Sequence, residues 1–387
     1  MQLHRPHILL LQLRAVPEFS LDDLLAGGAG VLSPNRWVAL APHLDEEVLL
    51  ELEDLAILEA LADDAAVSRD VLAGRFGEAR VDALVAAGLL LSDQPEHERW
   101  RARDRALRET AWWAPAAVAQ AFGRWQDVDV SADEQRGRTL AGMVEKNGLP
   151  PPATLEVRPR EHWQPMPQPA RTPLDTLLSA RSTCRNFDAA QSIPLADLAT
   201  TLHRVFAAQA TQELGPGTIM LKKNSPSGGG LHPVEAFVLV QAVDGLAPGL
   251  YHYVSTAHSH EPMQLLPPTQ LRSLAHELVA GQSWFANAPV LVLMAARFQR
   301  NFWKYRNHAK SWKVIQLDAG HLSQNLYLSA TELGYGAFVT AAINDRCAER
   351  VFELDGLSTG AVAVCGFGRR APTATHVEFD PLGKAVR

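Results

Sequence analysis

Three near-continuous apolar runs mark the second half of the chain, at residues 236–243, 289–296 and 360–366. Runs of this length without polar alternation are typical of strands that are buried on both faces of a sheet. Other segments place their apolar residues at helical spacing, namely 174–181, 195–208 and 314–333. The pattern predicts an α+β domain over residues 171–387, in which helices surround a central sheet. In the longest helix, Gly320 and Ala330 are expected to allow close packing.

The first 95 residues predict a separate small module. Residues 3–16 and 36–40 are expected to be strands, and residues 47–61 carry apolar side chains at helical spacing. A helical pair follows at 68–76, with Ser68 ahead of it, and at 80–88, before a short strand at 89–91. This order resembles the winged-helix recognition element of peptide-modifying enzymes, which binds a leader peptide as an added strand. A helical cap or dimerisation arm is the alternative, because a fold alone does not define a function.

Residues 96–170 are expected to connect the two domains. The stretch 96–147 is predicted to be mostly helical and holds four of the nine tryptophans, Trp100, Trp112, Trp113 and Trp125. They could line a substrate wall, but packing between a small and a large domain is the simpler interpretation. Residues 149–169 contain seven of the 25 prolines, which prevents regular structure and predicts an extended strap.

Composition narrows the possible partners. The net charge is −7 without a long basic run, so nucleic acid is not expected as a main partner. The three cysteines are far apart and form no CxxC, which argues against a disulfide scaffold or a zinc site, and no His/Asp/Glu grouping has metal-ligand spacing. No apolar stretch is long enough to span a bilayer, and the apolar residues 8–11 do not form a signal peptide. We therefore expect a cytoplasmic protein.

The densest glycine cluster immediately precedes the first apolar run. It is the stretch Ser225, Pro226, Ser227, Gly228, Gly229, Gly230. Because glycine has no Cβ, a flat ligand can lie against such a main chain and bind its N–H groups. The spacing matches neither GxxxxGK[ST] nor GxGxxG, so the usual nucleotide loops are not indicated. Taken alone, the glycines fit a flexible loop before a strand equally well.

Five segments occur in the order found in the nitroreductase superfamily of flavin enzymes. They are RSTCRNF at 181–187, PSGGGLHPVE at 226–235, GLYHY at 249–253, KYR at 304–306 and DAGH at 318–321. Within that superfamily the chain most resembles the SagB-type peptide dehydrogenases, which oxidise azolines to azoles during peptide maturation. The resemblance covers roughly residues 170–370. It implies a nitroreductase-like flavin fold behind the winged-helix-like domain, FMN as cofactor, and a homodimer with the flavin between its subunits.

The resemblance also implies where the phosphate of FMN would bind. Arg181, Ser182 and Arg185 correspond to the phosphate and ribityl contacts, and arginine forks match phosphate oxygens. In helical geometry two arginines four residues apart can point the same way; otherwise they form an ordinary solvated face. A basic residue after the last strand would complete the site. Arg369 and Arg370 both qualify, the sequence does not say which of them would bind, and either could be only surface charge.

The flavin ring would lie against the loop Ser225–Gly230, with His232 lining it, while Gly334 and Gly336 would leave room at the opposite edge. Hydrogen bonds at N1, O2 and N3 tune a flavin, so backbone amides and small hydroxyls suit this position. His321, three residues after Asp318, is interpreted as a structural histidine bonded to that carboxylate.

Lys304 and Tyr305 correspond to the Lys-Tyr pair of the azoline dehydrogenases and are our candidates for the proton-transferring base. Lysine and tyrosine ordinarily titrate near pH 10, which is too high for an efficient base near neutrality. A neighbouring cation lowers either pKa, and Lys304 and Arg306 supply that charge. The alternative is a surface lysine beside a packed tyrosine.

The sequence thus predicts an FMN-dependent dehydrogenase that desaturates a thiazoline or oxazoline of a precursor peptide, with a cyclodehydratase as a possible partner and dioxygen as the final acceptor. One alternative is an NAD(P)H-dependent nitro or quinone reductase of the same fold. The other is a flavin-free scaffold that binds a precursor peptide within a modification complex.

Overall fold

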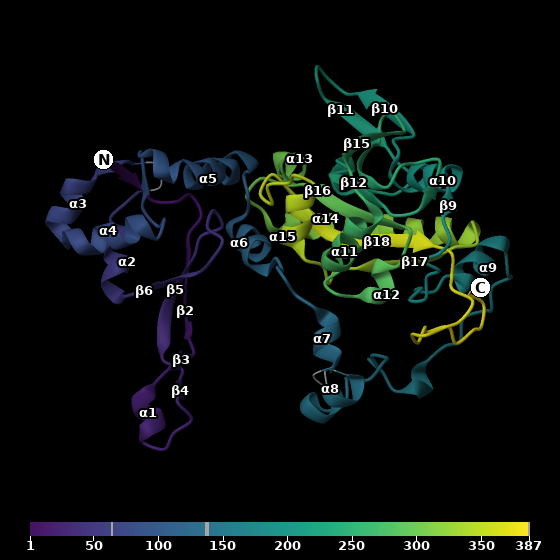
Figure 1. The fold of residues 1–387 in the computed structure, drawn as a ribbon, viewed down its shortest axis with the longest axis horizontal. Coiled ribbons are helices and arrows are strands. Elements are labelled where there is room, and N and C mark those ends of the chain that lie inside the picture. The colour runs from purple at the N-terminus through teal and green to yellow at the C-terminus, as the bar shows by residue number, and fades with distance from the viewer. Residues whose placement is uncertain (63–64, 136–138, 386–387) are drawn as a thin grey trace. The chain divides into compact units, whose positions relative to one another are not determined.

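The computed structural model describes residues 1–62, 65–135 and 139–385 (Figure 1). The chain divides into two compact units. The first comprises Met1–Arg124, Arg297–Ile315 and Leu354–Gly360, and the second comprises Trp125–Ala296, Gln316–Glu353 and Ala361–Arg387. Two short segments of the second half of the sequence therefore fold with the N-terminal residues.

The first unit contains two small antiparallel sheets. One has the strand order β7-β1-β8, formed by β1 (Gln2–His4), β7 (Val67–Ser68) and β8 (Leu91–Ser92). The other has the order β2-β5-β6, formed by β2 (Leu10–Ala15), β5 (Asn35–Leu40) and β6 (Val48–Leu50). The ribbon of β2 and β5 leads to a tip, purple in Figure 1, made of β3 (Glu18–Phe19), α1 (Leu21–Leu25) and β4 (Val31–Leu32).

Three helices complete this part of the first unit, α2 (Leu52–Glu59), α3 (Arg69–Phe76) and α4 (Glu78–Ala86). Leu3, Ile57 and Val81 are fully buried in the shared core. Ser68 caps α3 as its position predicted, since its Oγ accepts the Asp70 N–H at 3.3 Å. That these strands and helices amount to a winged helix stays a prediction.

Two predicted elements of this unit are wrong. The expected strand 3–16 is two strands in different sheets, β1 and β2. The expected helix 47–61 begins with a strand, because β6 pairs with residues 37–39 of β5. The helix starts only after Glu51, whose N–H donates to Asp54 Oδ2 at 2.8 Å in a capping box. Both segments contain runs of adjacent apolar residues, Ile8–Leu11 and Val48–Leu50, which do not distinguish strand from helix by periodicity.

Helices α5 (Glu98–Thr110), α6 (Ala114–Gly123) and α13 (Phe298–Lys304) also belong to the first unit. The buried Trp112 lies between them, with ring centroids 4.6 Å from both Phe298 and Phe302. Its Nε1–H donates to the Leu357 carbonyl at 2.8 Å. Trp112 is therefore a packing residue that joins three distant parts of the sequence, and not part of a substrate wall.

A six-stranded sheet forms the centre of the second unit, in the order β15-β14-β12-β16-β18-β17. Its strands are β12 (Val234–Val240), β14 (Gly249–Val254), β15 (Ser259–Leu265), β16 (Val290–Arg297), β17 (Gly336–Thr340) and β18 (Thr359–Gly368). Strand β12 pairs antiparallel with β14 and β16, and β17 pairs antiparallel with β18. The three predicted buried strands are confirmed as β12, β16 and β18.

Both faces of this sheet are covered, which explains the near-continuous apolar runs. Val238 and Val292 pack on one face in a core shared with α10 (Leu195–Phe206) and α14 (Ala309–Glu332). On β12, Phe237 takes the alternate position, and its ring lies 5.5 Å from that of Phe352 beyond α15 (Asp345–Val351). Gly320 of α14 is exposed with no atom within 4 Å of a Cβ placed there, so the expectation of close packing at this glycine is wrong.

The remaining elements surround the sheet. The helices are α7 (Val130–Gln135), α8 (Leu140–Asn147), α9 (Pro173–Ala180), α11 (Pro268–Leu278) and α12 (Ser283–Ala286). The short strands are β9 (Ile193–Pro194), β10 (Ala210–Glu213), β11 (Ile219–Lys222) and β13 (Val243–Asp244), so the run 236–243 is two strands and not one. The proline-rich span 149–169 contains only one short 3₁₀ turn, as expected. Among the described residues, the helices include none long and apolar enough to span a membrane.

Candidate functional site

The segment 181–187, expected to contact phosphate, is extended and not helical. Helix α9 ends at Ala180, and Arg181 has φ −65° and ψ 123°. The Cys184 N–H donates to the Ala337 carbonyl of β17 at 2.8 Å, and Thr183 forms a parallel bridge with Ala337. The segment therefore lies along β17 at the edge of the sheet, and its arginines do not have the helical geometry that would point both the same way.

The two arginines of this segment contact different neighbours. The Arg181 guanidinium lies 5.4 Å from the ring centre of Tyr327 in α14, where the Thr183 Oγ1 is also 3.0 Å from the Tyr327 hydroxyl. The Arg185 guanidinium lies 6.0 Å from the ring centre of Phe285 in α12. Both side chains are half-buried against aromatic rings. The structure thus places two cations at this edge but directs them toward different helices.

The two arginines after β18 also differ. Arg369 is exposed, with its guanidinium 5.5 Å from the ring centre of Tyr335. The Arg370 side chain is 7% exposed, donates to Ser182 Oγ at 2.8 Å and pairs with the Glu378 carboxylate. The Ser182 hydroxyl is therefore engaged inside the protein. Of the two arginines, Arg369 is the one that solvent reaches.

The glycine loop enters β12 through a single turn. Gly229 and Gly230 have φ of 66° and 70°, the left-handed region that glycine adopts without a steric penalty. His232 also has positive φ, at 46°, and its side chain is half-buried. Gly229 is exposed, so main chain of this loop is accessible to a ligand.

Helix α14 holds the loop in place. The Ser227 hydroxyl donates to Asp318 Oδ2 at 2.5 Å, and the Gly228 N–H donates to Oδ1 at 3.1 Å. Further along the helix, Asn325 Nδ2 donates to the Ser225 Oγ at 2.8 Å. The loop is therefore fixed at both of its serines and is not a flexible connection.

Asp318 and Lys223 are the residues that sequence reasoning missed. Burial raises the pKa of Asp318, while the hydrogen bonds from Ser227 and Gly228 and the charges of His321 and Lys223 act in the opposite direction. Lys223 is 2% exposed and, with Asp318 and His232, lines a small pocket behind the loop. The DAGH segment contains Asp318, but only the fold reveals that this carboxylate anchors the glycine loop, and Lys223 belongs to no motif. His321 is exposed, and the expectation of a structural histidine held by Asp318 is wrong.

Gly334 and Gly336 have different surroundings. Gly334, with φ 80°, is exposed and has no atom within 4 Å of a Cβ placed there. A Cβ on Gly336 would lie 2.6 Å from both Cβ and Sγ of Cys184. The space beside Gly336 is thus filled by the chain itself, and only Gly334 leaves open room.

Lys304 and Tyr305 end helix α13 of the first unit. Lys304 is exposed, Tyr305 is half-buried, and the Lys304 Nζ lies 5.8 Å from the centre of the Tyr305 ring. The Tyr305 N–H donates to the Asn301 carbonyl at 3.3 Å and closes the helix. The pair is thus a cation beside a phenol at a helix end.

Comparison with known proteins defines the class. The nitroreductase family model matches residues 178–369. The chain is 32% identical over 147 residues to the nitroreductase-like protein MJ1384 of Methanocaldococcus jannaschii. The aligned residues cover 37% of this chain and 67% of that protein. The chain belongs to the nitroreductase family. The resemblance seen in the five sequence segments is therefore confirmed at the level of the family and its fold.

Two further relatives are peptide-processing proteins by name. The trifolitoxin-processing protein TfxB of Rhizobium leguminosarum bv. trifolii is 31% identical over 137 residues, 35% of this chain and 36% of TfxB. The microcin B17-processing protein McbC of Escherichia coli is 27% identical over 158 residues, 40% of this chain and 56% of McbC. The chain thus spans about a third of the length of TfxB and about half of the length of McbC.

Among solved structures, the E. coli microcin synthetase McbBCD complex with truncated pro-MccB17 bound matches with a TM-score of 0.45 and 20% identity, over 62% of this chain and 86% of that chain. A nitroreductase-like protein of Ralstonia eutropha matches with a TM-score of 0.42 and 25% identity, over 54% and 89%.

Proposed function

We propose that this protein is an FMN-dependent dehydrogenase that oxidises thiazoline or oxazoline rings in a ribosomally made precursor peptide. The observation that carries the proposal is the fixed glycine loop at Ser225–Gly230. Asp318 and Asn325 anchor it, and Gly229 adopts a left-handed conformation with an exposed main chain. It occurs in a nitroreductase-family chain, two of whose relatives are named as peptide-processing proteins.

Several residues of the second unit suit FMN by the chemistry of their donors. Arg181, Arg185 and Arg369 supply guanidinium groups for the phosphate. The glycine loop supplies backbone amides, and Gly334 supplies open space, for the ring. When bound, the flavin would supply a hydride acceptor at its N5 atom.

The oxidation also requires a base. Converting an azoline to an azole transfers one ring hydrogen as hydride and releases another as a proton, and dioxygen finally accepts the two electrons and becomes hydrogen peroxide. We assign proton removal to Lys304 and Tyr305. The two side chains are adjacent in the sequence, and the Lys304 Nζ lies 5.8 Å from the centre of the Tyr305 ring.

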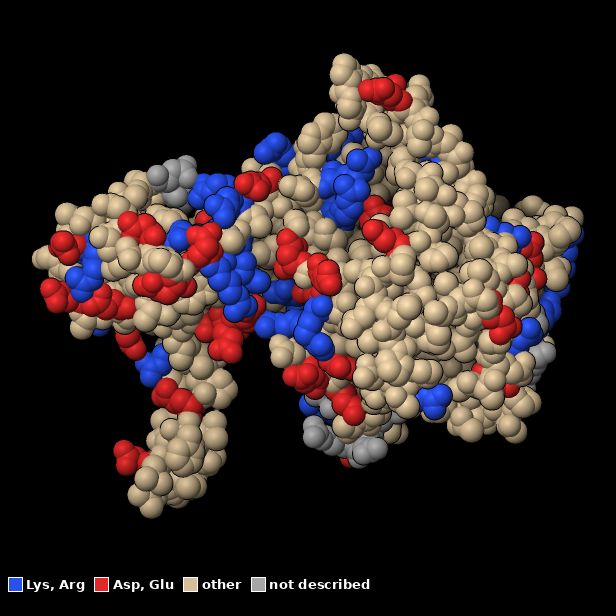
Figure 2. Space-filling view, turned by 45° about the horizontal axis from the view of Figure 1, so that its top comes forward, with Lys and Arg blue, Asp and Glu red and all other residues tan. Residues whose placement is uncertain are grey.

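The partners follow from the same proposal. A broad face of the second unit carries few charged side chains (Figure 2), and charge depletion is typical of the centre of a subunit interface, which supports a homodimer. The β2-β5-β6 sheet of the first unit has β2 as an edge strand, which supports leader-peptide binding by strand addition. A cyclodehydratase, which forms azolines, would supply the substrate.

The test is oxidation of an azoline-containing precursor peptide by the FMN-loaded protein. We expect the peptide to lose two hydrogen atoms per ring, measured by mass spectrometry, with an equal yield of hydrogen peroxide. Lys304→Met and Tyr305→Phe should each lower the rate at least about 100-fold, because a positioned base typically contributes 10²–10⁴-fold. Lys310→Met is the matched control, since Lys310 is also exposed in this basic stretch.

The name of MJ1384 supports a second candidate, an NAD(P)H-dependent reductase of small nitro or quinone compounds. NADH oxidation that proceeds without peptide and is unaffected by Lys304→Met would favour this reductase. If FMN-loaded protein neither oxidises the peptide nor oxidises NADH, both enzyme functions are contradicted. The remaining hypothesis is then a scaffold that binds the precursor peptide.

A further inference from the structure

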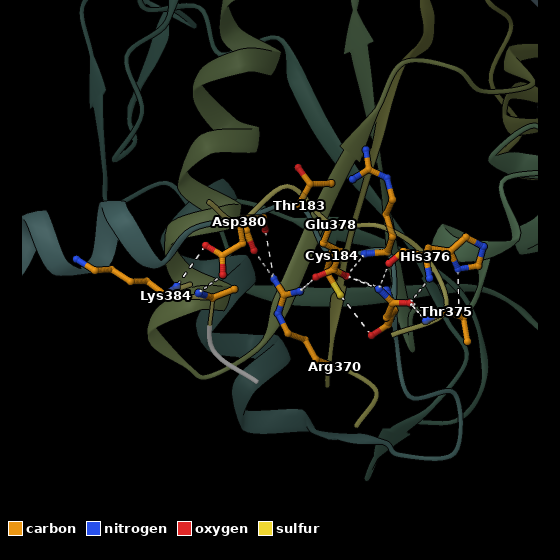
Figure 3. A network of polar contacts seen from close by, with 12 residues as sticks. Thr183, Cys184, Arg370, Thr375, His376, Glu378, Asp380 and Lys384 are labelled. Atoms are coloured by element: carbon orange, nitrogen blue, oxygen red, sulfur yellow. Dashed lines mark hydrogen bonds and ion pairs between the residues drawn. The ribbon is translucent and has the colours of Figure 1, made fainter. Parts of the chain in front are cut away.

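The C-terminal segment Ala371–Glu378 packs against the Arg181–Asn186 segment (Figure 3). The Ala371 N–H donates to the Asn186 carbonyl at 2.7 Å. The Asn186 Oδ1 accepts the N–H groups of Thr375 and His376, each at 2.8 Å, and its Nδ2 donates to the His376 carbonyl at 2.9 Å. The buried Asn186 thus joins the two segments through hydrogen bonds of both its main chain and its side chain.

Glu378 is bound by four donors at the end of this contact. Its Oε1 accepts the Arg185 N–H at 2.6 Å, the Asn186 N–H at 3.0 Å and the Asn186 Nδ2 at 2.9 Å. Its Oε2 pairs with Arg370. Burial alone would raise the pKa of Glu378, but these donors and the charge of Arg370 outweigh it and lower the pKa. The carboxylate is therefore ionised near neutrality.

Arg370 extends the contact to the other end of the segment. While one Nη pairs with Glu378, the other donates to the Ser182 Oγ at 2.8 Å and lies 3.4 Å from the Ser182 carbonyl. Contacts therefore run from Ser182 through Arg370 and Glu378 to the main chain of Arg185 and Asn186. They hold the segment at both ends, with Thr183 and Cys184 paired to β17 between them.

We propose that Glu378 is a positioning residue, which through Arg370 sets the conformation of the segment that presents Arg181 and Arg185 to the phosphate of FMN. This inference rests on the proposed flavin function. A segment held at two points has less conformational entropy to lose when its arginines bind a ligand. The positions of charged ligand-binding groups depend on such supporting contacts.

If the Glu378 carboxylate occupied the phosphate site itself, the Glu378 substitution would have the opposite effect on FMN binding. Two backbone N–H groups beside an arginine can bind any anion. If the Glu378 carboxylate stood where the phosphate binds, removing its charge would strengthen FMN binding. A positioning role requires that removing it weaken FMN binding.

The test compares FMN with riboflavin, which has the same ring but no phosphate. Dissociation constants are measured by flavin fluorescence titration for wild type, Glu378→Gln and Glu353→Gln, an exposed glutamate at the end of α15 that serves as the matched control. For Glu378→Gln we expect FMN binding to weaken about tenfold, the loss of about one charge-assisted contact, and riboflavin binding to change less than about twofold. A general loss of structure would weaken both flavins equally.

Arg370→Lys provides a milder second variant, because it keeps a cation beside Glu378 but loses the fork that also reaches Ser182. We expect its FMN-to-riboflavin ratio to fall between those of wild type and Glu378→Gln. A ratio unchanged in both variants, or tighter FMN binding by Glu378→Gln, would overturn the positioning role while leaving the flavin function intact. Wild-type protein that binds no FMN would instead contradict the flavin function and this inference with it.

Discussion

At the scale of single residues, the candidate site depends on long-range contacts that the motifs do not reveal. The sequence predicted the glycine loop, because three consecutive glycines ahead of an apolar run are unusual. It did not predict that Asp318 anchors the loop, because the bonding partners lie 90 residues apart. Nor did it separate Arg369 from Arg370, because which of two adjacent arginines is buried depends on Glu378, in a tail without periodicity.

Asp318 allows a prediction about pH. Its pKa is raised by burial, so the folded state binds a proton at this carboxyl more tightly than the unfolded chain does. The stabilisation from this proton is therefore fully present below the unfolded pKa of about 3.9 and is lost as pH rises through the folded pKa. Relative to Asp318→Asn, the free energy of unfolding of wild type should fall as pH increases from the acid range to neutrality.

Urea unfolding of both proteins at several pH values measures this difference. Wild type and Asp318→Asn share every other titrating group, so the difference between them isolates this carboxyl. A difference that is independent of pH would show that the hydrogen bonds from Ser227 and Gly228 fully offset burial, and one that grows toward neutrality would show that they outweigh it; either result would contradict the prediction.

At the scale of elements, burial decided which strands were predictable. Strands β12, β16 and β18 are covered on both faces and read as apolar runs, whereas the edge strand β15 (Ser259–Leu265) is mostly exposed and polar and was missed. For the segment 181–187, the sequence left open whether its two arginines would adopt the helical geometry that points both the same way. Its extended form comes from pairing with β17, a long-range contact that no local pattern shows.

The pairing between that segment and β17 requires Gly336. An alanine Cβ there would lie 2.6 Å from Cys184, so Gly336→Ala should push the segment away from β17 and cost about 1–3 kcal/mol of stability. Because the segment carries Arg181 and Arg185, FMN binding should weaken as well. Stability is measured by urea unfolding and binding by fluorescence titration.

Gly320→Ala is the matched control for this substitution. Gly320 is exposed in α14 with open space around it, so alanine should stabilise the helix by up to about 1 kcal/mol. The role of Gly336 is contradicted if Gly336→Ala, like Gly320→Ala, weakens neither stability nor FMN binding.

At the scale of the whole molecule, the sequence predicted a small N-terminal module and a larger catalytic domain joined by a connector. The compact units differ from that division, since α5, α6 and residues 297–315 fold with the N-terminal residues. Trp112 shows why the pattern could not reveal this: its partners Phe298 and Phe302 lie almost 200 positions away, in an ordinary helical sequence. The family, by contrast, was evident, because its five segments are local and occur in a fixed order.

The most direct test of the flavin function is the visible absorption spectrum of the purified protein, with the released chromophore identified by chromatography. We expect a yellow protein that releases FMN, and a colourless Arg181→Ala/Arg185→Ala variant of unchanged far-ultraviolet circular dichroism, because the phosphate loses two cations. A colourless wild-type protein that takes up no added FMN would contradict the flavin function.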